Sequence, residues 1–240
     1  MSDPQKLSII QGGIGAGSSM KIRHQVLAAI QILSASEAMG FAAYLGLDLP
    51  KTAAAVIDSE AWSWMFGNRL SRMLDPHFQP VASAVTIILK DTSIITSEAR
   101  GAHFPTPMTS TAEQVYFASF GKGYESDDDS SLIRMYTEGI GRTGHIKDLA
   151  QAEKEKSVLI VNLLKSVHLC AVTETIAFAH HVNLDLYQVF DLCVTAAGGS
   201  RMLSNVGREV VQALLDGNTA TGWPNNGTQE SLETVAQQLQ

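Results

Sequence analysis

The sequence has few cysteines, few charged residues and no dense cluster of lysine or arginine. Its two cysteines, Cys170 and Cys193, lack metal-ligand spacing and lie within apolar helical patterns, so we interpret both as reduced core thiols and expect no bound metal. Only 17% of the residues are charged, and the net charge is -7. This charge argues against nucleic acid or an anionic membrane as a partner, because both require a basic surface.

Signals for secretion and membrane insertion are also missing. The residues after Met1 lack the basic start and apolar core of a signal peptide. No uninterrupted apolar run has the length of a transmembrane span, because Gln25, Gln31 and Glu37 interrupt the best candidate. We therefore expect a cytoplasmic protein, and its 45% of apolar residues suffices for an ordinary globular core.

A glycine-dense entry, Gly12 to Ser19, precedes the longest helical pattern in the chain. Apolar residues then recur at helical spacing, which predicts a core helix from Ser19 to Tyr44 with the Glu37 carboxylate inside its buried stripe. Similar patterns make the predicted fold class all-α. The further helices are expected at 49–57, up to Leu74, and at 80–99, 108–120, 132–138, 158–181, up to Val194 and 231–240.

The second half of the sequence repeats the first at an offset of 137 residues, the separation of Glu37 and Glu174. Periodicity alone explains matched apolar residues, but not the matching of Asp48 with Asp185 in the same register. We therefore predict two tandem helical repeats, 1–143 and a shortened 144–240, packed about a pseudo-twofold axis through the two long helices. The glycine-rich stretch 139–144 resembles a dinucleotide fingerprint but follows a helix, so we interpret it as the linker.

Several motifs of the first half together resemble one enzyme family. They are Gly12 to Lys21, Ser36-Glu37-Ala38-Met39, Trp64 to Arg69, Leu89-Lys90-Asp91 and Asp129-Ser130-Ser131. This set is similar to the all-helical C-terminal domain of the β-hydroxyacid dehydrogenases, the 3-hydroxyisobutyrate and threonate dehydrogenase family, which is related to 6-phosphogluconate dehydrogenase. The resemblance implies a helical domain that dimerises through its helices and lies behind a nucleotide-binding domain.

The resemblance also implies roles for particular residues. Lys21 matches the family's general acid or base at the substrate hydroxyl, while nicotinamide takes the hydride. His24 or Gln25 matches an amide residue that helps to hold the substrate, and Lys90 matches a lysine near substrate and cofactor. The family usually has Asn where this chain has His24, which departs from the family's pattern of substrate recognition.

The residues themselves support a candidate site with a simpler alternative at each position. Lys21 is expected in the first turn of its helix, where the dipole disfavours a cation and lowers a lysine pKa, and His24 and Gln25 would share its face. A solvated lysine and a core histidine are the alternatives. Lys90 is a substrate contact or half of a surface pair. The aromatic residues Trp62, Trp64 and Phe66 floor an apolar pocket or pack a helix corner.

The function expected from the sequence depends on an absence. Fewer than a dozen residues precede the glycine entry, too few for a nucleotide-binding domain. We therefore expect no cofactor, and a small organic, natural-product substrate held in an apolar inter-helix cleft for non-redox cyclisation, including a pericyclic step, isomerisation or dehydration. Lys21 and His24 are the candidate catalytic residues.

Two alternatives stay open. One is the substrate domain or subunit of an NAD(P)-dependent β-hydroxyacid dehydrogenase that lacks its nucleotide domain. The other is a non-catalytic protein that binds a small molecule or mediates assembly. In each case a homodimer is a partner to test for.

Overall fold

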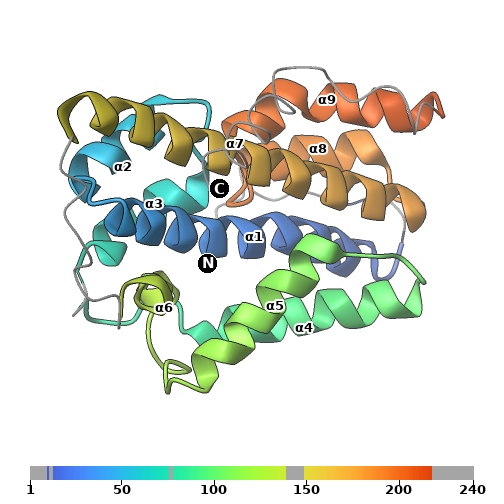
Figure 1. Ribbon diagram of the computed structural model, residues 1–240. Coiled ribbons are helices and arrows are strands. Elements are labelled where there is room, and N and C mark those ends of the chain that lie inside the picture. The colour runs from blue at the N-terminus through green and yellow to red at the C-terminus, as the bar shows by residue number, and fades with distance from the viewer. Residues whose placement is uncertain (1–9, 11–12, 76–77, 139–148, 218–240) are drawn as a thin grey trace.

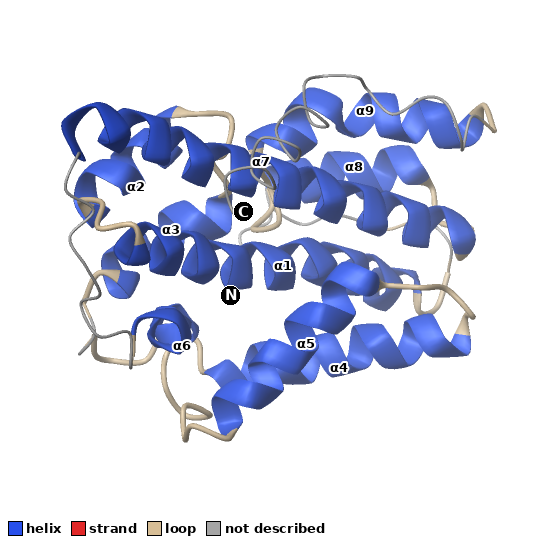
Figure 2. Cartoon of the chain, in the orientation of Figure 1, coloured by secondary structure: helices blue, strands red, loops and turns tan. Residues whose placement is uncertain are grey.

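Helix α1 (Ala16–Tyr44) is the axis around which the other helices pack. The computed structural model describes residues 10, 13–75, 78–138 and 149–217. In Figure 1, α7 runs along one side of α1 and the pair α4 and α5 lies on the opposite side. Figure 2 shows that the regular structure of the described residues is helical, which confirms the all-α prediction.

The first three helices begin and end at local signals in the sequence. α1 begins at Ala16, earlier than the predicted Ser19, and Gly46 (φ 74) follows its C-terminal end, as expected for a helix that stops at a glycine. α2 (Leu49–Asp58) is capped by the Asp48 side chain, which accepts a hydrogen bond from the Lys51 N–H. α3 (Trp64–Met73) has the equivalent cap in Ser63.

The next segment departs from the predicted helix at 80–99. α4 (Val85–Gly101) begins later, because the Asp128 carboxylate accepts the Ala82 N–H (2.8 Å) and holds the preceding residues extended. α5 (Pro107–Phe120) follows as predicted. The helix expected at 132–138 is instead a 3₁₀-helix, η2 (Asp129–Ile133), and one turn of α6 (Arg134–Thr137).

Three helices lie in the described part of the second half. They are α7 (Leu149–His181), α8 (Leu186–Thr195) and α9 (Arg201–Leu215). α7 begins well before the predicted start at Val158, so much of the charged stretch before it is helical. The glycine-rich stretch 139–144, the boundary at residue 143 and the helix expected at 231–240 lie outside the described residues.

Several boundaries of corresponding helices fall at the same 137-residue offset as the sequence match. α1 and α7 end at Tyr44 and His181, and the left-handed Gly46 has its counterpart in Asn183 (φ 58). Asp185 and Ser200 cap α8 and α9 in the same way as Asp48 and Ser63 cap α2 and α3. The two halves therefore share the local geometry of this helical unit.

The halves meet at an antiparallel bridge between Ser63 and Ser200. The Trp64 N–H donates to the Gly199 carbonyl (2.9 Å), and the Arg201 N–H donates to the Trp62 carbonyl (3.1 Å). Each bond is the other's counterpart at the 137-residue offset. This reciprocal pair is what a local twofold relation at the bridge requires.

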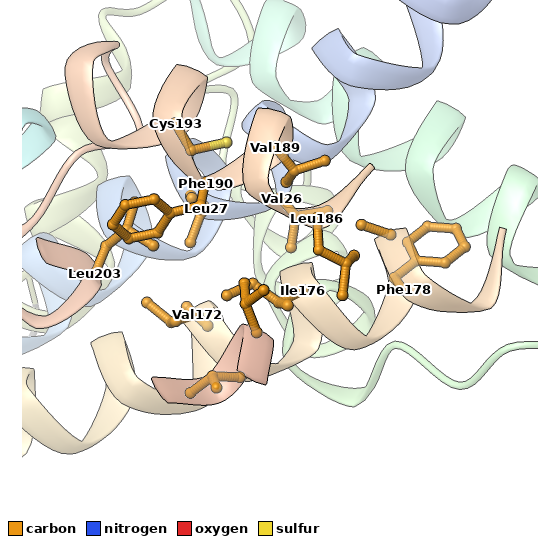
Figure 3. Packing of buried hydrophobic residues seen from close by; sticks show 14 of the residues in the cluster. Val26, Leu27, Val172, Ile176, Phe178, Leu186, Val189, Phe190, Cys193 and Leu203 are labelled. Atoms are coloured by element: carbon orange, nitrogen blue, oxygen red, sulfur yellow. The ribbon is translucent and has the colours of Figure 1, made fainter. Parts of the chain in front are cut away.

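The core between α1, α7, α8 and α9 is closely packed. Figure 3 shows Leu27, Val172, Phe190 and other side chains of this cluster pointing toward one another. Cys193 belongs to the cluster, and its burial raises the thiol pKa to about 12. Cys170 is exposed, so the expectation that both thiols lie in the core is wrong for this residue, which lies on the outward face of α7.

The two matched glutamates take different partners. Glu37 accepts a hydrogen bond from the Tyr136 hydroxyl (3.0 Å), whereas Glu174 accepts the backbone N–H groups of Met108 (2.7 Å) and Thr109 (3.0 Å). Burial raises the pKa of both carboxyls, and these hydrogen bonds oppose the rise. Glu174 thus caps α5, and each glutamate is held by hydrogen bonds to its own partners.

Two described helices, α1 and the segment Glu155–His181, have the length and composition of a membrane span, despite the polar residues that interrupt α1. Such a test is also passed by core helices, and 83% of the apolar window of α1 is buried inside the protein. Packing against the other helices therefore accounts for the apolar character of α1.

Candidate functional site

Four of the residues proposed from the sequence lie together where α1 meets α4. Lys21, His24 and Gln25 lie on α1, and the Gln25 amide nitrogen donates to the Asp91 carboxylate on α4. Lys90 Nζ lies 3.0 Å from the other Asp91 oxygen, and the Gln25 side chain raises the pKa of the neighbouring His24 ring, as an amide oxygen facing the ring does. We call these five residues the α1/α4 cluster.

The helical repeat of α1 explains why the cluster forms. Residues three and four positions apart lie on one helix face, so Lys21, His24 and Gln25 project together. Because α1 begins at Ala16, Lys21 lies in the second turn of the helix instead of the first turn that we expected. Lys21 and Lys90 are exposed, and Asp91 is buried beneath the side chain of Lys90.

His24 is held as a neutral ring. Burial lowers its pKa, the nearby charge of Lys21 lowers it further, and the hydrogen bond with Gln25 opposes both effects. The Nε2 atom accepts a hydrogen bond from the Gly198 N–H (2.8 Å), which a protonated Nε2 could not do. The histidine therefore suits hydrogen bonding and positioning better than proton release at Nε2.

A buried ion pair lies at the same interface between α1 and α4. Arg23 is fully buried, and its Nη2 atom lies 2.5 Å from Glu98 Oε1 on α4. The guanidinium carbon lies 3.8 Å from the centre of the Phe178 ring, a cation–π contact with α7. Within the described residues its Nε and Nη1 atoms have no hydrogen-bond partner. Arg23 thus ties α1 to α4 and α7 beside the cluster.

An open groove of about 560 Å³ runs along α4 next to these contacts. Charged, hydroxyl and apolar side chains line it: Lys90, Ser93, Ile94, Ser97 and Glu98. This mixed lining differs from the apolar cleft between two halves that we expected. A ligand with a carboxylate and hydroxyl groups would find Lys90 and serine hydroxyls here.

The three aromatic residues proposed from the sequence lie elsewhere, at the start of α3. Phe66 is fully buried in the core, so it cannot floor an open pocket. The Trp62 ring lies 5.9 Å from the guanidinium carbon of Arg201, and Trp64 donates its backbone N–H to Gly199. Phe66 thus packs in the core, and Trp62 and Trp64 lie at the junction of the halves, where the N-terminal end of α3 meets α9. This arrangement corresponds to the alternative in which the aromatic residues pack a helix corner.

A second cavity, of about 280 Å³, has a structural role. Its lining includes Arg72, Asp127, Asp128 and Arg134. Arg72 Nε lies 3.0 Å from Asp128, and Arg134 is paired with Asp127. Asp128 also accepts backbone and hydroxyl hydrogen bonds, which outweigh its burial and lower its pKa to about 2. Because carboxylates already neutralise both arginines, neither Arg72 nor Arg134 is a free cation for a ligand.

Sequence reasoning missed four contributors to the site. Asp91 was visible only as the neighbour of Lys90, and Glu98 and Arg23 belong to no motif that the sequence analysis singled out. Gly198 follows a helix in the second half, and nothing local indicates its contact with His24. Among the described residues, no group of three or more His, Cys, Asp or Glu side chains is placed to hold a metal.

Comparison with known proteins places the cluster inside a recognised region. Residues 15–136 match the family described as NAD-binding of NADP-dependent 3-hydroxyisobutyrate dehydrogenase. L-threonate dehydrogenase of Escherichia coli K12 is 37% identical over 123 residues, which are 51% of this chain and 40% of that protein. Human mitochondrial 3-hydroxyisobutyrate dehydrogenase is 29% identical over 136 residues, 53% of this chain and 40% of the relative.

A solved structure was also found in the comparison. The crystal structure of 3-hydroxyisobutyrate dehydrogenase from Salmonella typhimurium is 38% identical, with a TM-score of 0.49, and the match covers 51% of this chain and 42% of that one. The match to the curated relatives thus spans about 40% of their length.

These matches overturn the function that we expected first. The related proteins are dehydrogenases, and the matching family is described by NAD binding, so the expectation of a cofactor-independent cyclase or isomerase of natural-product biosynthesis is wrong. That expectation depended on the few residues before the glycine entry. The alternative of a dehydrogenase domain fits the matches better.

Proposed function

This chain belongs to the family described as NAD-binding of NADP-dependent 3-hydroxyisobutyrate dehydrogenase, and from this premise we propose that its first half is the substrate-holding helical domain of an NAD(P)-dependent β-hydroxyacid dehydrogenase. The observation that supports the proposal is the α1/α4 cluster, which lies within residues 15–136 and borders the open groove. L-threonate and 3-hydroxyisobutyrate, for which the relatives are named, are the substrates to test first.

Each residue of the cluster has a role in this proposal. Lys21 is exposed on the face that it shares with His24 and Gln25, and acts as the proton acceptor at the substrate hydroxyl during oxidation. Gln25 donates a hydrogen bond to the substrate, and Lys90 balances the negative charge of the substrate carboxylate at the groove. A nicotinamide cofactor would supply the redox chemistry of such an enzyme.

The described residues do not by themselves offer a dinucleotide crevice. Such a crevice forms at the ends of parallel strands, and the described residues contain helices and two isolated bridges. Gly13, Gly15 and Gly17 line the entry to α1, and a Cβ at any of them would meet no atom within 4 Å, so they form no closed cradle for phosphates. We therefore assign to these residues the substrate side of the reaction and no step at the nucleotide.

We also propose that 1–143 and 144–240 are two copies of one unit, related to the C-terminal helical domain of 6-phosphogluconate dehydrogenase. The paired helix ends, the paired caps and the reciprocal bonds at Ser63 and Ser200 support this proposal. In it, the second half takes the position of a partner domain. A homodimer and a cytoplasmic location stay predictions.

Ligand binding tests the proposed function directly. Isothermal titration calorimetry of the whole chain with L-threonate and with 3-hydroxyisobutyrate, each with and without NADP⁺, should show saturable binding of at least one acid. Lys21→Met should weaken that binding and, wherever turnover is measurable, lower kcat by about 100-fold or more, because the proton acceptor is lost. Lys51→Met, at an exposed lysine of α2, is the matched control. No binding by the unmodified chain would refute the proposal.

A further inference from the structure

We propose that Gly198, in the loop between α8 and α9, is a positioning residue for the substrate: its peptide group holds His24, and His24 orients the Gln25 amide so that an N–H group faces the substrate. The inference rests on the proposed function of the α1/α4 cluster. It goes beyond that function by giving the second half of the chain a part in the site.

Gly198 contacts α1 through both ends of its backbone. Its N–H donates to His24 Nε2 (2.8 Å), and its carbonyl accepts a hydrogen bond from Gln31 Nε2 (2.8 Å). His24 and Gln31 lie two helical turns apart on the same face of α1, so one buried residue of the second half fixes two side chains of the first. The contact is a clamp across the junction of the two halves.

The direction of each hydrogen bond follows from this clamp. Because His24 Nε2 accepts the Gly198 N–H, the neutral ring carries its proton on Nδ1. Gln25 raises the pKa of His24, which is the effect of an acceptor facing a ring N–H, so we place the amide oxygen of Gln25 toward Nδ1–H. The Asp91 carboxylate only accepts, so it takes the Gln25 amide nitrogen, as the structure shows.

The orientation of the Gln25 amide is therefore fixed from both sides. Rotating the amide by half a turn would place its oxygen against the Asp91 carboxylate and its NH₂ group against the Nδ1–H of His24. The second N–H of the amide stays available for a ligand. It would favour a ligand that offers an acceptor, such as a carboxylate or hydroxyl oxygen, over one that offers only donors.

Only glycine fits at position 198 without moving α1 or the loop. A Cβ there would lie 3.1 Å from His24 Cδ2, 3.1 Å from Leu27 Cβ and 3.3 Å from the His24 carbonyl oxygen. Two of these atoms belong to the backbone or its first side-chain carbon, so they cannot rotate away. A side chain at 198 would push the loop off α1 and lengthen the bond to His24.

The other half has no such clamp. At the 137-residue offset, Ala61 stands opposite Gly198 and Val161 opposite His24, and valine has no atom that could accept the bond. The loop of the second half thus contacts the α1/α4 cluster, whereas the corresponding loop of the first half has no histidine opposite it to hold. This asymmetry indicates that the clamp serves the cluster instead of the general joining of the halves.

Two measurements on Gly198→Ala test the inference. The ¹⁵N shifts of the His24 ring, measured without ligand, should show the Nδ1–H tautomer in the unmodified chain and a mixture of tautomers in the variant. Calorimetry with the hydroxy acid that binds should show about tenfold weaker affinity, the effect of one misoriented hydrogen bond. Gly121→Ala is the control, since its Cβ would lie 3.3 Å from a backbone oxygen at the end of α5.

A second variant covers the case in which Gly198→Ala does not fold. His24→Leu removes the acceptor and leaves the loop unchanged, and it should weaken binding by a similar factor. If both singles fold, the double variant should bind no more weakly than either. An unchanged tautomer with unchanged affinity in Gly198→Ala overturns the inference and leaves the proposed function standing. If the unmodified chain binds no hydroxy acid, the proposed function and the substrate role fall together, whereas the tautomer still shows whether the clamp exists.

Discussion

The N-terminal part of α1 and the corresponding part of α7 share a helix and differ in chemistry. At the 137-residue offset, the counterparts of Lys21, His24 and Gln25 are Val158, Val161 and Asn162. Both segments are helical, and both lead into helices that end at equivalent residues. The same helical scaffold therefore accepts either set of side chains. Whether a candidate site forms depends on a few side chains of α1 and on the neighbouring helix α4.

The same comparison extends into the core. Arg23, fully buried, has Ile160 as its counterpart, and Gln31 has His168. Gln31 donates to Gly198, whereas both ring nitrogens of His168 lack a hydrogen-bond partner in the described part of the chain. Each half therefore buries one polar side chain with unsatisfied hydrogen-bonding atoms, Arg23 or His168, where the other half has an apolar or a hydrogen-bonded residue.

The largest expected effect is the acid sensitivity caused by His168. Burial lowers its pKa from 6.5 to about 4, so the folded protein keeps the ring neutral while the unfolded chain protonates it near pH 6.5. The free energy of unfolding should therefore decrease as the pH falls from 6.5 to 4, by about 3 kcal/mol, and this contribution should level off below pH 4.

Urea unfolding at pH 7 and pH 4.5 measures this effect. His168→Gln, which installs the counterpart residue, should remove most of the difference between the two pH values. Glu37 and Glu174, whose pKa values burial raises, are present in both proteins, so their contributions to the pH dependence cancel. His180→Gln, at an exposed position, is the control, and an unchanged pH dependence in His168→Gln would contradict the prediction.

A smaller effect is expected for the buried ion pair. Glu98→Gln leaves the Arg23 guanidinium buried without its counter-charge and should lower the free energy of unfolding by about 2 kcal/mol. Arg23→Leu brings position 23 close to its counterpart Ile160 and should change stability by less than about 1 kcal/mol, because Glu98 is 30% exposed and can be hydrated. Thermal unfolding of both variants measures the ordering, and a larger loss in Arg23→Leu would reverse our account.

The smallest effects are expected at the paired helix caps. Asp185 accepts two backbone N–H bonds, from Tyr187 and Gln188, whereas Asp48 accepts one from Lys51. Asp185→Ala should cost about 1 kcal/mol and Asp48→Ala somewhat less. Equal losses in urea unfolding would show that the first cap bond carries the whole effect, and Asp216→Ala, just after α9, provides a baseline.

Local signals explain how much of the fold could be predicted. Asp48 and Gly46 act on the backbone within a few residues, so α2 and the end of α1 were placed from the sequence. For α3 the sequence analysis gave only the end, near Leu74, and the structure shows the Ser63 cap at its start. The start of α4 was misplaced because the Asp128 side chain, distant in sequence, holds the residues before it extended. Cys170 was misjudged because an apolar helical pattern does not say which face a neighbour covers.

The candidate site divides in the same way. Spacing along one helix put Lys21, His24 and Gln25 together, and the structure added Asp91 and Gly198, which reach them from other elements. Trp62, Trp64 and Phe66 were grouped by composition, but the start of α3 turns Phe66 into the core. The expected cyclase failed because the number of residues before a motif carries no chemistry, while the motif itself matched dehydrogenases.

The sequence by itself determined which segments become helices and where most of them stop, because caps, glycines and apolar spacing act over a few residues. Tertiary structure alone decided which distant groups join the candidate site: α4 brings Asp91 to Gln25, and a loop of the second half brings Gly198 to His24. Such contacts join atoms far apart in the chain, and their geometry exists only once the helices have packed.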